Sequence, residues 1–90
     1  MSDRGRIRST AEEDRAFESA VLQHVLFLHP AAVALEDLAR ELGTDAGSFA
    51  EQDALERAVR DLCGAGLLHR NGPLLLPSRA ALRFDELLGD

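Results

Sequence analysis

Three histidines and one cysteine are the side chains best suited to metal binding or nucleophilic catalysis. His24 and His29 stand five residues apart, whereas a metal-binding helix places its two histidines four apart on one face. Cys63 has no second cysteine at zinc-site spacing, and its place near the end of a predicted helix is typical of a packed thiol. No serine or cysteine forms a pattern with a histidine that indicates a nucleophile and its base. We therefore expect no catalytic residue, no metal site and no cofactor, and we infer no small-molecule ligand.

Arginine supplies all ten basic residues of the chain, and their distribution is uneven. Residues 1–10 carry three arginines and one acid, residues 11–56 carry two arginines and eleven acids, and residues 57–90 carry five arginines and four acids. Duplex DNA attracts a protein through lysine and arginine side chains that displace its counterions. With a net charge of −6, this chain must gather its arginines on one face if it binds DNA.

The bulk composition is that of one globular domain. The 90 residues are 46% hydrophobic and 29% charged, which suits a single modest core. No apolar run is long enough to span a bilayer, and the N-terminal sequence MSDRGRIRST lacks the apolar segment of a signal peptide. A lone cysteine suits a reducing compartment. We expect a cytoplasmic protein with no membrane partner.

Hydrophobic spacing predicts two helices in the first half of the chain. The first runs from about Ala11 to Leu28, is capped by Ser9 or Thr10, and ends before Pro30. A short extended piece covers residues 31–35. A second helix covers residues 35–43 and ends at a glycine. The link over residues 44–52 is either an extended loop or the early start of a third helix capped near Ser48, with Phe49 packed onto the core.

The stretch from residue 51 to residue 78 predicts a helix, a glycine break and a hairpin. Leu55, Val59 and Leu62 share one helical face, with Ala58 beside them, and should point into the core. Gly64 and Gly66 should end the helix. Two leucine-rich strands then flank Asn71-Gly72, which favours a chain reversal. Pro73 has no N–H, so we expect the hairpin loop to be one or two residues longer than the simplest Asn-Gly turn.

A final helix is predicted from Arg79 to Leu88, with Ser78 as its cap. One face of this helix is apolar and consists of Ala80, Ala81, Phe84, Leu87 and Leu88. This face either covers the first helix, the interpretation that we favour, or forms an element of a dimer.

Together these features resemble the winged helix-turn-helix superfamily of bacterial transcription regulators. The residues LEDLARELG (35–43) match the phrase L-x-x-L-A-x-x-L-G that opens the family's helix-turn-helix, and the leucine hairpin resembles the wing. The resemblance covers about residues 17–84. It implies a mainly α fold with a small β-hairpin wing. We expect one domain at residues 11–90, and the polar, charged composition of residues 1–10 predicts a mobile basic arm. The link after Gly43 departs from the family because it is longer than the usual 3–4-residue turn.

The resemblance implies a cytoplasmic transcription regulator that binds duplex DNA through its third helix and wing. The contact residues that it implies there are Gln52, Arg57, Arg60, His69, Arg70 and Asn71. The arm would add Arg4, Arg6 and Arg8 as minor-groove contacts.

The alternative is an acidic winged helix that binds no DNA and acts through protein contacts or as a homodimer. Three pairs at helical i, i+4 spacing are predicted on the third helix: Asp53–Arg57, Glu56–Arg60 and Arg57–Asp61. Each pair is too weak to hold an arginine away from phosphate, but carboxylates that face the groove would repel the duplex. DNA binding predicts one continuous positive surface that includes Arg57, Arg60 and Arg70. Protein contact predicts a third-helix face of mixed charge and an exposed apolar patch elsewhere.

Overall fold

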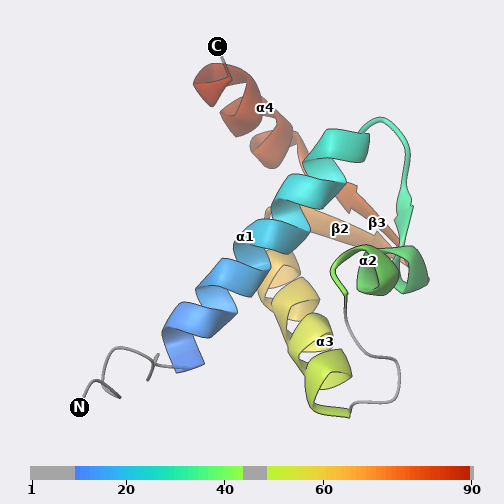
Figure 1. Cartoon of the computed structure of the whole chain (residues 1–90). Coiled ribbons are helices and arrows are strands. Elements are labelled where there is room, and N and C mark those ends of the chain that lie inside the picture. The colour runs from blue at the N-terminus through green and yellow to red at the C-terminus, as the bar shows by residue number, and fades with distance from the viewer. Residues whose placement is uncertain (1–9, 44–48, 90) are drawn as a thin grey trace.

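In the computed structural model, which describes residues 10–43 and 49–89, the described chain forms four helices and one small sheet (Figure 1). The elements follow one another as α1 (Thr10–Leu28), β1 (Val33–Ala34), α2 (Leu35–Glu41), α3 (Phe49–Gly64), β2 (Leu68–Asn71), β3 (Leu74–Pro77) and α4 (Arg79–Leu88). The expectation of a mainly helical chain with a small β-hairpin is confirmed. The predicted arm, the cap Ser9, the cap Ser48 and the side chain of Phe49 lie outside the described residues.

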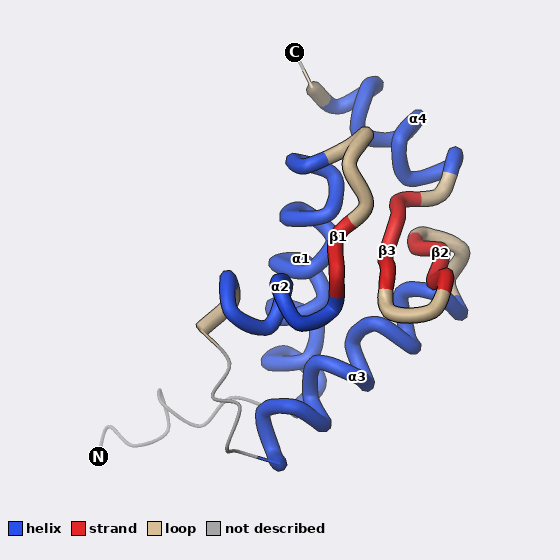
Figure 2. The backbone as a smooth tube through the Cα atoms, turned by 90° about the vertical axis from the view of Figure 1, so that its right-hand side faces the viewer, coloured by secondary structure: helices blue, strands red, loops and turns tan. Residues whose placement is uncertain are grey.

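The three strands form one antiparallel sheet in the order β1-β3-β2 (Figure 2). Strand β3 lies in the middle, where Leu75 pairs with Val33 of β1 on one side and with Arg70 of β2 on the other. The side chain of Leu75 is fully buried. The short strand β1 therefore attaches the start of α2 to the hairpin, although the two are about 40 residues apart in the sequence.

The hairpin loop is shorter than we expected. Asn71 pairs with Leu74, so only Gly72 and Pro73 lie between the strands, and the prediction of a longer tip is wrong. Gly72 has a φ of 62°, which suits the first position of a two-residue hairpin turn. Pro73 occupies the second position, where no N–H donor is needed. Its carbonyl accepts a hydrogen bond of 2.9 Å from the N–H of Leu35, which ties the hairpin tip to α2.

The core lies between α1, α2, α3 and the sheet. Leu55, Val59 and Leu62 of α3 are buried there, as their spacing predicts. The other buried hydrophobic residues of this cluster are Val21, Val25, Val33, Leu38, Ala58, Leu68 and Leu75. Because the apolar face of α3 is turned inward, the opposite face is held toward solvent, and that face carries the predicted contact residues.

A left-handed glycine ends α3. Gly64 is the last helical residue, and Gly66 has a φ of 83°. The N–H of Leu67 donates to the carbonyl of Leu62 at 2.9 Å, and the N–H of Gly66 donates to the carbonyl of Cys63 at 3.1 Å. These two bonds form the Schellman arrangement, which aims the chain into β2.

Helix α4 begins at the predicted cap and extends away from the other elements (Figure 1). The hydroxyl oxygen of Ser78 accepts a hydrogen bond of 3.0 Å from the N–H of Ala81, and both residues are buried. Farther along the helix, Phe84, Leu87 and Leu88 are exposed. Among the described residues, none of the helices has the length and apolar character needed to traverse a bilayer.

Candidate functional site

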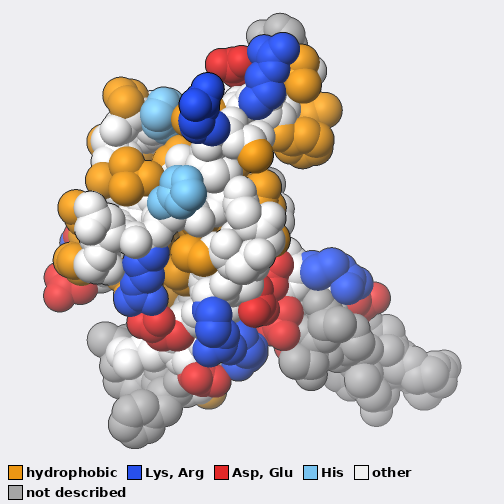
Figure 3. Space-filling view, turned by 180° about the vertical axis from the view of Figure 1, so that it is seen from behind, with side chains coloured by type: hydrophobic (Ala, Val, Ile, Leu, Met, Phe, Trp, Pro, Cys, Tyr) orange, Lys and Arg blue, Asp and Glu red, His pale blue; other side chains and the backbone are white. Residues whose placement is uncertain are grey.

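The outward face of α3 and the adjoining strand β2 hold all six contact residues that the sequence predicts for this region. Gln52 and Arg60 on α3 are exposed, Arg57 is half-buried, and His69, Arg70 and Asn71 follow along β2 with exposed side chains. Arginine and acidic side chains lie next to each other in the lower part of the face that Figure 3 shows. The predicted arm residues Arg4, Arg6 and Arg8 lie outside the described part of the chain.

Two carboxylates bind Arg57. Its guanidinium donates to Asp14 of α1 at 3.2 Å and to Asp53, one turn earlier on α3, at 2.9 Å. Its hydrogen bond to Asp14, followed by the charge of that residue, raises the pKa of Arg57 above its ordinary value. The predicted Asp53–Arg57 pair is therefore present. The partner on α1 lies 43 positions away in the sequence, and helical spacing alone did not indicate it.

Arg70 on the hairpin is bound by α3. Its guanidinium donates to Glu56 at 3.1 Å, and its Nε donates to the carbonyl of Gly72 at 3.2 Å. Glu56 thus pairs with Arg70 of β2 and not with Arg60, its predicted partner. The same contact braces the hairpin against α3, because the two elements share an ion pair that is only partly exposed.

Arg57 and Arg70 lie on opposite flanks of α3. Arg57 lines a shallow recess against α1, together with Asp14 and Phe17. Arg70 lines a separate groove on the α2 side of the helix. The expectation that these two arginines and Arg60 would form one continuous positive surface therefore lacks support in the described residues, because carboxylates lie between and beside them.

Arg60 differs from these two arginines. Its side chain is exposed on α3, and within residues 10–43 and 49–89 it makes no ion pair or hydrogen bond. It is therefore the cation of this face that is best placed to meet a ligand.

The groove on the α2 side is a feature that the sequence reasoning missed. It has a volume of about 800 Å³ and lies between α2, α3 and the tip of the hairpin. Charged side chains of both signs border it, including Glu36, Arg40, Glu56 and Arg70. Its apolar lining consists of Ala34, Leu35, Ala39, Leu55 and Pro73. The residues come from four separate elements, so no local pattern in the sequence could have indicated the groove.

Two carboxyl groups meet between α1 and α3. Burial, followed by the charge of Asp61 and a hydrogen bond to it, raises the pKa of Glu18 above its ordinary value. Asp14 adds to this effect and Arg15 opposes it. The α1–α3 contact therefore combines an ion pair at Arg57 with a repulsive carboxyl pair one helical turn away.

Cys63 and His24 are two of the side chains considered above for metal binding or catalysis. Cys63 is half-buried at the end of α3, and the Nε2 atom of His24 is buried without a partner among the described residues. Within the described part of the chain, no group of three His, Cys, Asp or Glu side chains is close enough to hold a metal ion.

Comparisons with protein-family models, curated proteins and solved structures gave no match.

Proposed function

We propose that this chain is a winged helix-turn-helix domain that acts by contacting proteins and does not bind duplex DNA on its own. The helix-turn-helix phrase at residues 35–43, the element order and a β2–β3 hairpin that follows α3 support the winged-helix part of the proposal. A fold does not determine a function, so the claim that the chain contacts proteins and not DNA must rest on the residues of the site.

The pairing of Arg57 and Arg70 with carboxylates carries the proposal. Arg57 is held by Asp14 and Asp53, and Arg70 is held by Glu56. Each exposed pair contributes only about 0–1 kcal/mol, so phosphate could compete for an arginine. The carboxylates would nevertheless remain at the contact surface and repel the duplex.

The surroundings favour a protein partner over a phosphate backbone. The groove beside α3 joins an apolar lining to charged borders of both signs, as protein interfaces with an apolar centre and a polar rim do. Charges of both signs can be matched by a protein surface, whereas the duplex offers negative charge only.

The test is a fluorescence anisotropy titration of a labelled random duplex of about 20 base pairs, at about 50 mM and about 200 mM salt. We expect no saturable binding at micromolar protein, and no difference between the natural chain and the variant Arg60→Ala. Saturable binding that weakens with salt, and that Arg60→Ala weakens further, would overturn the protein-contact proposal.

Duplex DNA binding is the second candidate, and Arg60 favours it. This side chain is exposed on the outward face of α3, and no described residue neutralises it by direct contact. In that case Arg60 would contact base edges or phosphate, with His69 and Asn71 of β2 beside it.

A further inference from the structure

We propose that α4 pairs antiparallel with α4 of a second copy of the chain, about a two-fold axis near Phe84. The inference rests on the protein-contact function proposed above and identifies the partner as a second copy of the chain. Two observations on α4 support it: an exposed apolar stripe and the order of charges along the helix.

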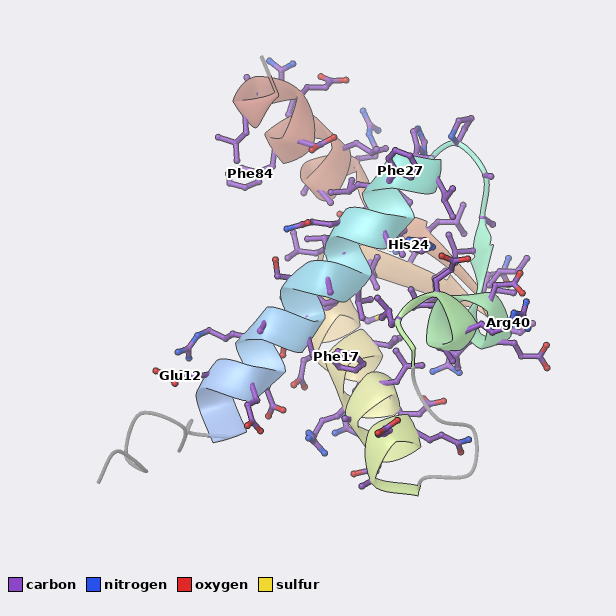
Figure 4. The ribbon with its side chains drawn as sticks, in the orientation of Figure 1. Glu12, Phe17, His24, Phe27, Arg40 and Phe84 are labelled. Carbon is purple, nitrogen blue, oxygen red and sulfur yellow. The ribbon has the colours of Figure 1, made fainter. Side chains whose placement is uncertain are left out.

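The apolar face of α4 continues from the body of the protein into solvent. Ala81, in the first turn, is 2% exposed, whereas Phe84, Leu87 and Leu88 are 59%, 66% and 69% exposed. Phe84 points off the helix into open space in Figure 4, and hydrophobic side chains gather over α4 in Figure 3. The interpretation that α4 only covers α1 therefore accounts for its first turn and leaves the later turns without a partner among the described residues.

The charges on α4 run against the dipole of the helix. Arg79 and Arg83 stand in its first half, and Asp85 and Glu86 stand in its second half. A helix is stabilised by acidic residues near its N-terminus and basic residues near its C-terminus, which is the reverse order. An antiparallel copy would place the basic half of each helix beside the acidic half of the other. The charge order that destabilises a single α4 would therefore stabilise a pair of them.

The positions of the apolar residues fit the same arrangement. Ala80, Phe84 and Leu88 are spaced four apart and form one stripe on the exposed side of α4. With the axis at Phe84, each Ala80 faces Leu88 of the second copy, and Arg83 lies on the same flank of the pair as Glu86 of the second copy. A small residue thus meets a large one at both ends, and the same surface serves both copies, as a two-fold interface requires.

The size of the stripe predicts a weak dimer. A ten-residue helix is about 15 Å long. If each of its three large exposed side chains contributes roughly 100 Å², the two copies bury roughly 600 Å² of side-chain surface. This area is below the roughly 1,200 Å² at which standard-size interfaces begin, so we expect the dimer to be weak and transient.

A second copy explains more than a foreign helix would. An unrelated amphipathic helix could cover Phe84 and Leu88, but it gives no reason for basic residues to precede acidic ones on α4. The exposed intrachain pair between Arg83 and Glu86, at 3.2 Å, can persist at the edge of the proposed interface.

The test is sedimentation equilibrium of the full chain from about 5 to about 500 µM. We expect a monomer–dimer equilibrium, and we expect Phe84→Glu to raise its dissociation constant at least about tenfold. Phe27→Glu is the matched control, because Phe27 of α1 is 82% exposed and lies outside the proposed interface. Phe84 is exposed, so its replacement should leave the helical circular dichroism signal unchanged.

A charge-exchange experiment tests the antiparallel order. One variant carries Arg79→Glu and Arg83→Glu, and the other carries Asp85→Arg and Glu86→Arg. Each alone should dimerise at least about tenfold more weakly than the natural chain, and their equimolar mixture should form a one-to-one complex.

Different results would contradict the α4 pairing and the proposed protein-contact function. A chain that is monomeric at every concentration, or a dimer that Phe84→Glu and the charge variants leave unchanged, would overturn the α4 pairing alone. Salt-sensitive DNA binding in the anisotropy titration would overturn the protein-contact function, whatever the oligomeric state.

Discussion

Arg57 and Arg70 illustrate how tertiary contacts change what an arginine can do. Both side chains occupy positions at which a winged helix would present positive charge to DNA. Each is nevertheless bound by a carboxylate from another element. Asp14 reaches Arg57 from α1, and Glu56 reaches Arg70 from α3. Among the described residues of the contact face, Arg60 is therefore the arginine whose charge no carboxylate offsets by direct contact.

Glu18 should destabilise the fold at neutral pH. Its pKa is raised in the folded chain, so the folded state holds the proton more tightly than the unfolded state does. The associated stabilisation is present below the ordinary pKa of a glutamate and is lost as the pH rises through the raised value. At neutral pH the ionised carboxylate instead faces the charge of Asp61.

We therefore expect Glu18→Gln to raise the free energy of unfolding at about pH 7. Solvent screens this partly exposed site, so the gain should be about 0.2–1 kcal/mol. The gain should shrink as the pH is lowered through the raised pKa of Glu18, because the glutamate of the natural chain then becomes protonated. Urea denaturation of both proteins across this pH range measures the effect. A gain that grows on acidification would contradict the assigned direction of the pKa shift.

At the scale of the elements, the end of α3 sets the direction of the hairpin. Gly66 adopts a left-handed conformation that L side chains rarely adopt, while Gly64 is still helical. No atom lies within 4 Å of a Cβ placed at either residue, so any difference between them reflects the backbone alone. The two glycines therefore form a matched pair for mutation.

We expect Gly66→Ala to lower the free energy of unfolding by about 1–2 kcal/mol, because alanine resists the left-handed region. Gly64→Ala should be neutral or should stabilise the chain by up to about 1 kcal/mol, because alanine favours the helix. Urea denaturation midpoints compare the two variants directly. Equal destabilisation by both would show that the Schellman end does not depend on Gly66.

Local patterns in the sequence predicted most of the elements. The spacing of Leu55, Val59 and Leu62 predicted the buried face of α3, and Ser78 predicted the first turn of α4. The hairpin loop was predicted too long, because the sequence did not show that Asn71 pairs with Leu74 and leaves Pro73 at a position that needs no N–H.

The geometry of the site was less accessible to sequence reasoning. The pairs Arg57–Asp14 and Arg70–Glu56 join residues 43 and 14 positions apart, so only the packing of α1 and the hairpin against α3 creates them. The groove between α2, α3 and the hairpin is likewise a product of tertiary packing.

At the scale of the whole molecule, an acidic body carries two different surfaces. One is the α3 and hairpin face with its mixed charges and adjoining groove, and the other is α4, which extends from the body with exposed leucine and phenylalanine side chains. The described chain measures 45 × 32 × 21 Å, so it is elongated, and Figure 1 shows α4 at one end of it. Both surfaces combine apolar area with charges of both signs, which suits protein partners better than DNA.

The most direct measurement compares the duplex DNA affinity of the natural chain with that of a variant carrying Asp14→Asn, Asp53→Asn and Glu56→Gln. These changes remove the carboxylates that bind Arg57 and Arg70 and leave all the arginines in place. At about 50 mM salt we predict at least about tenfold tighter binding by the variant, with the gain lost at about 200 mM salt or on adding Arg57→Ala and Arg70→Ala. Tight, salt-sensitive binding by the natural chain, with no gain in the variant, would contradict the account.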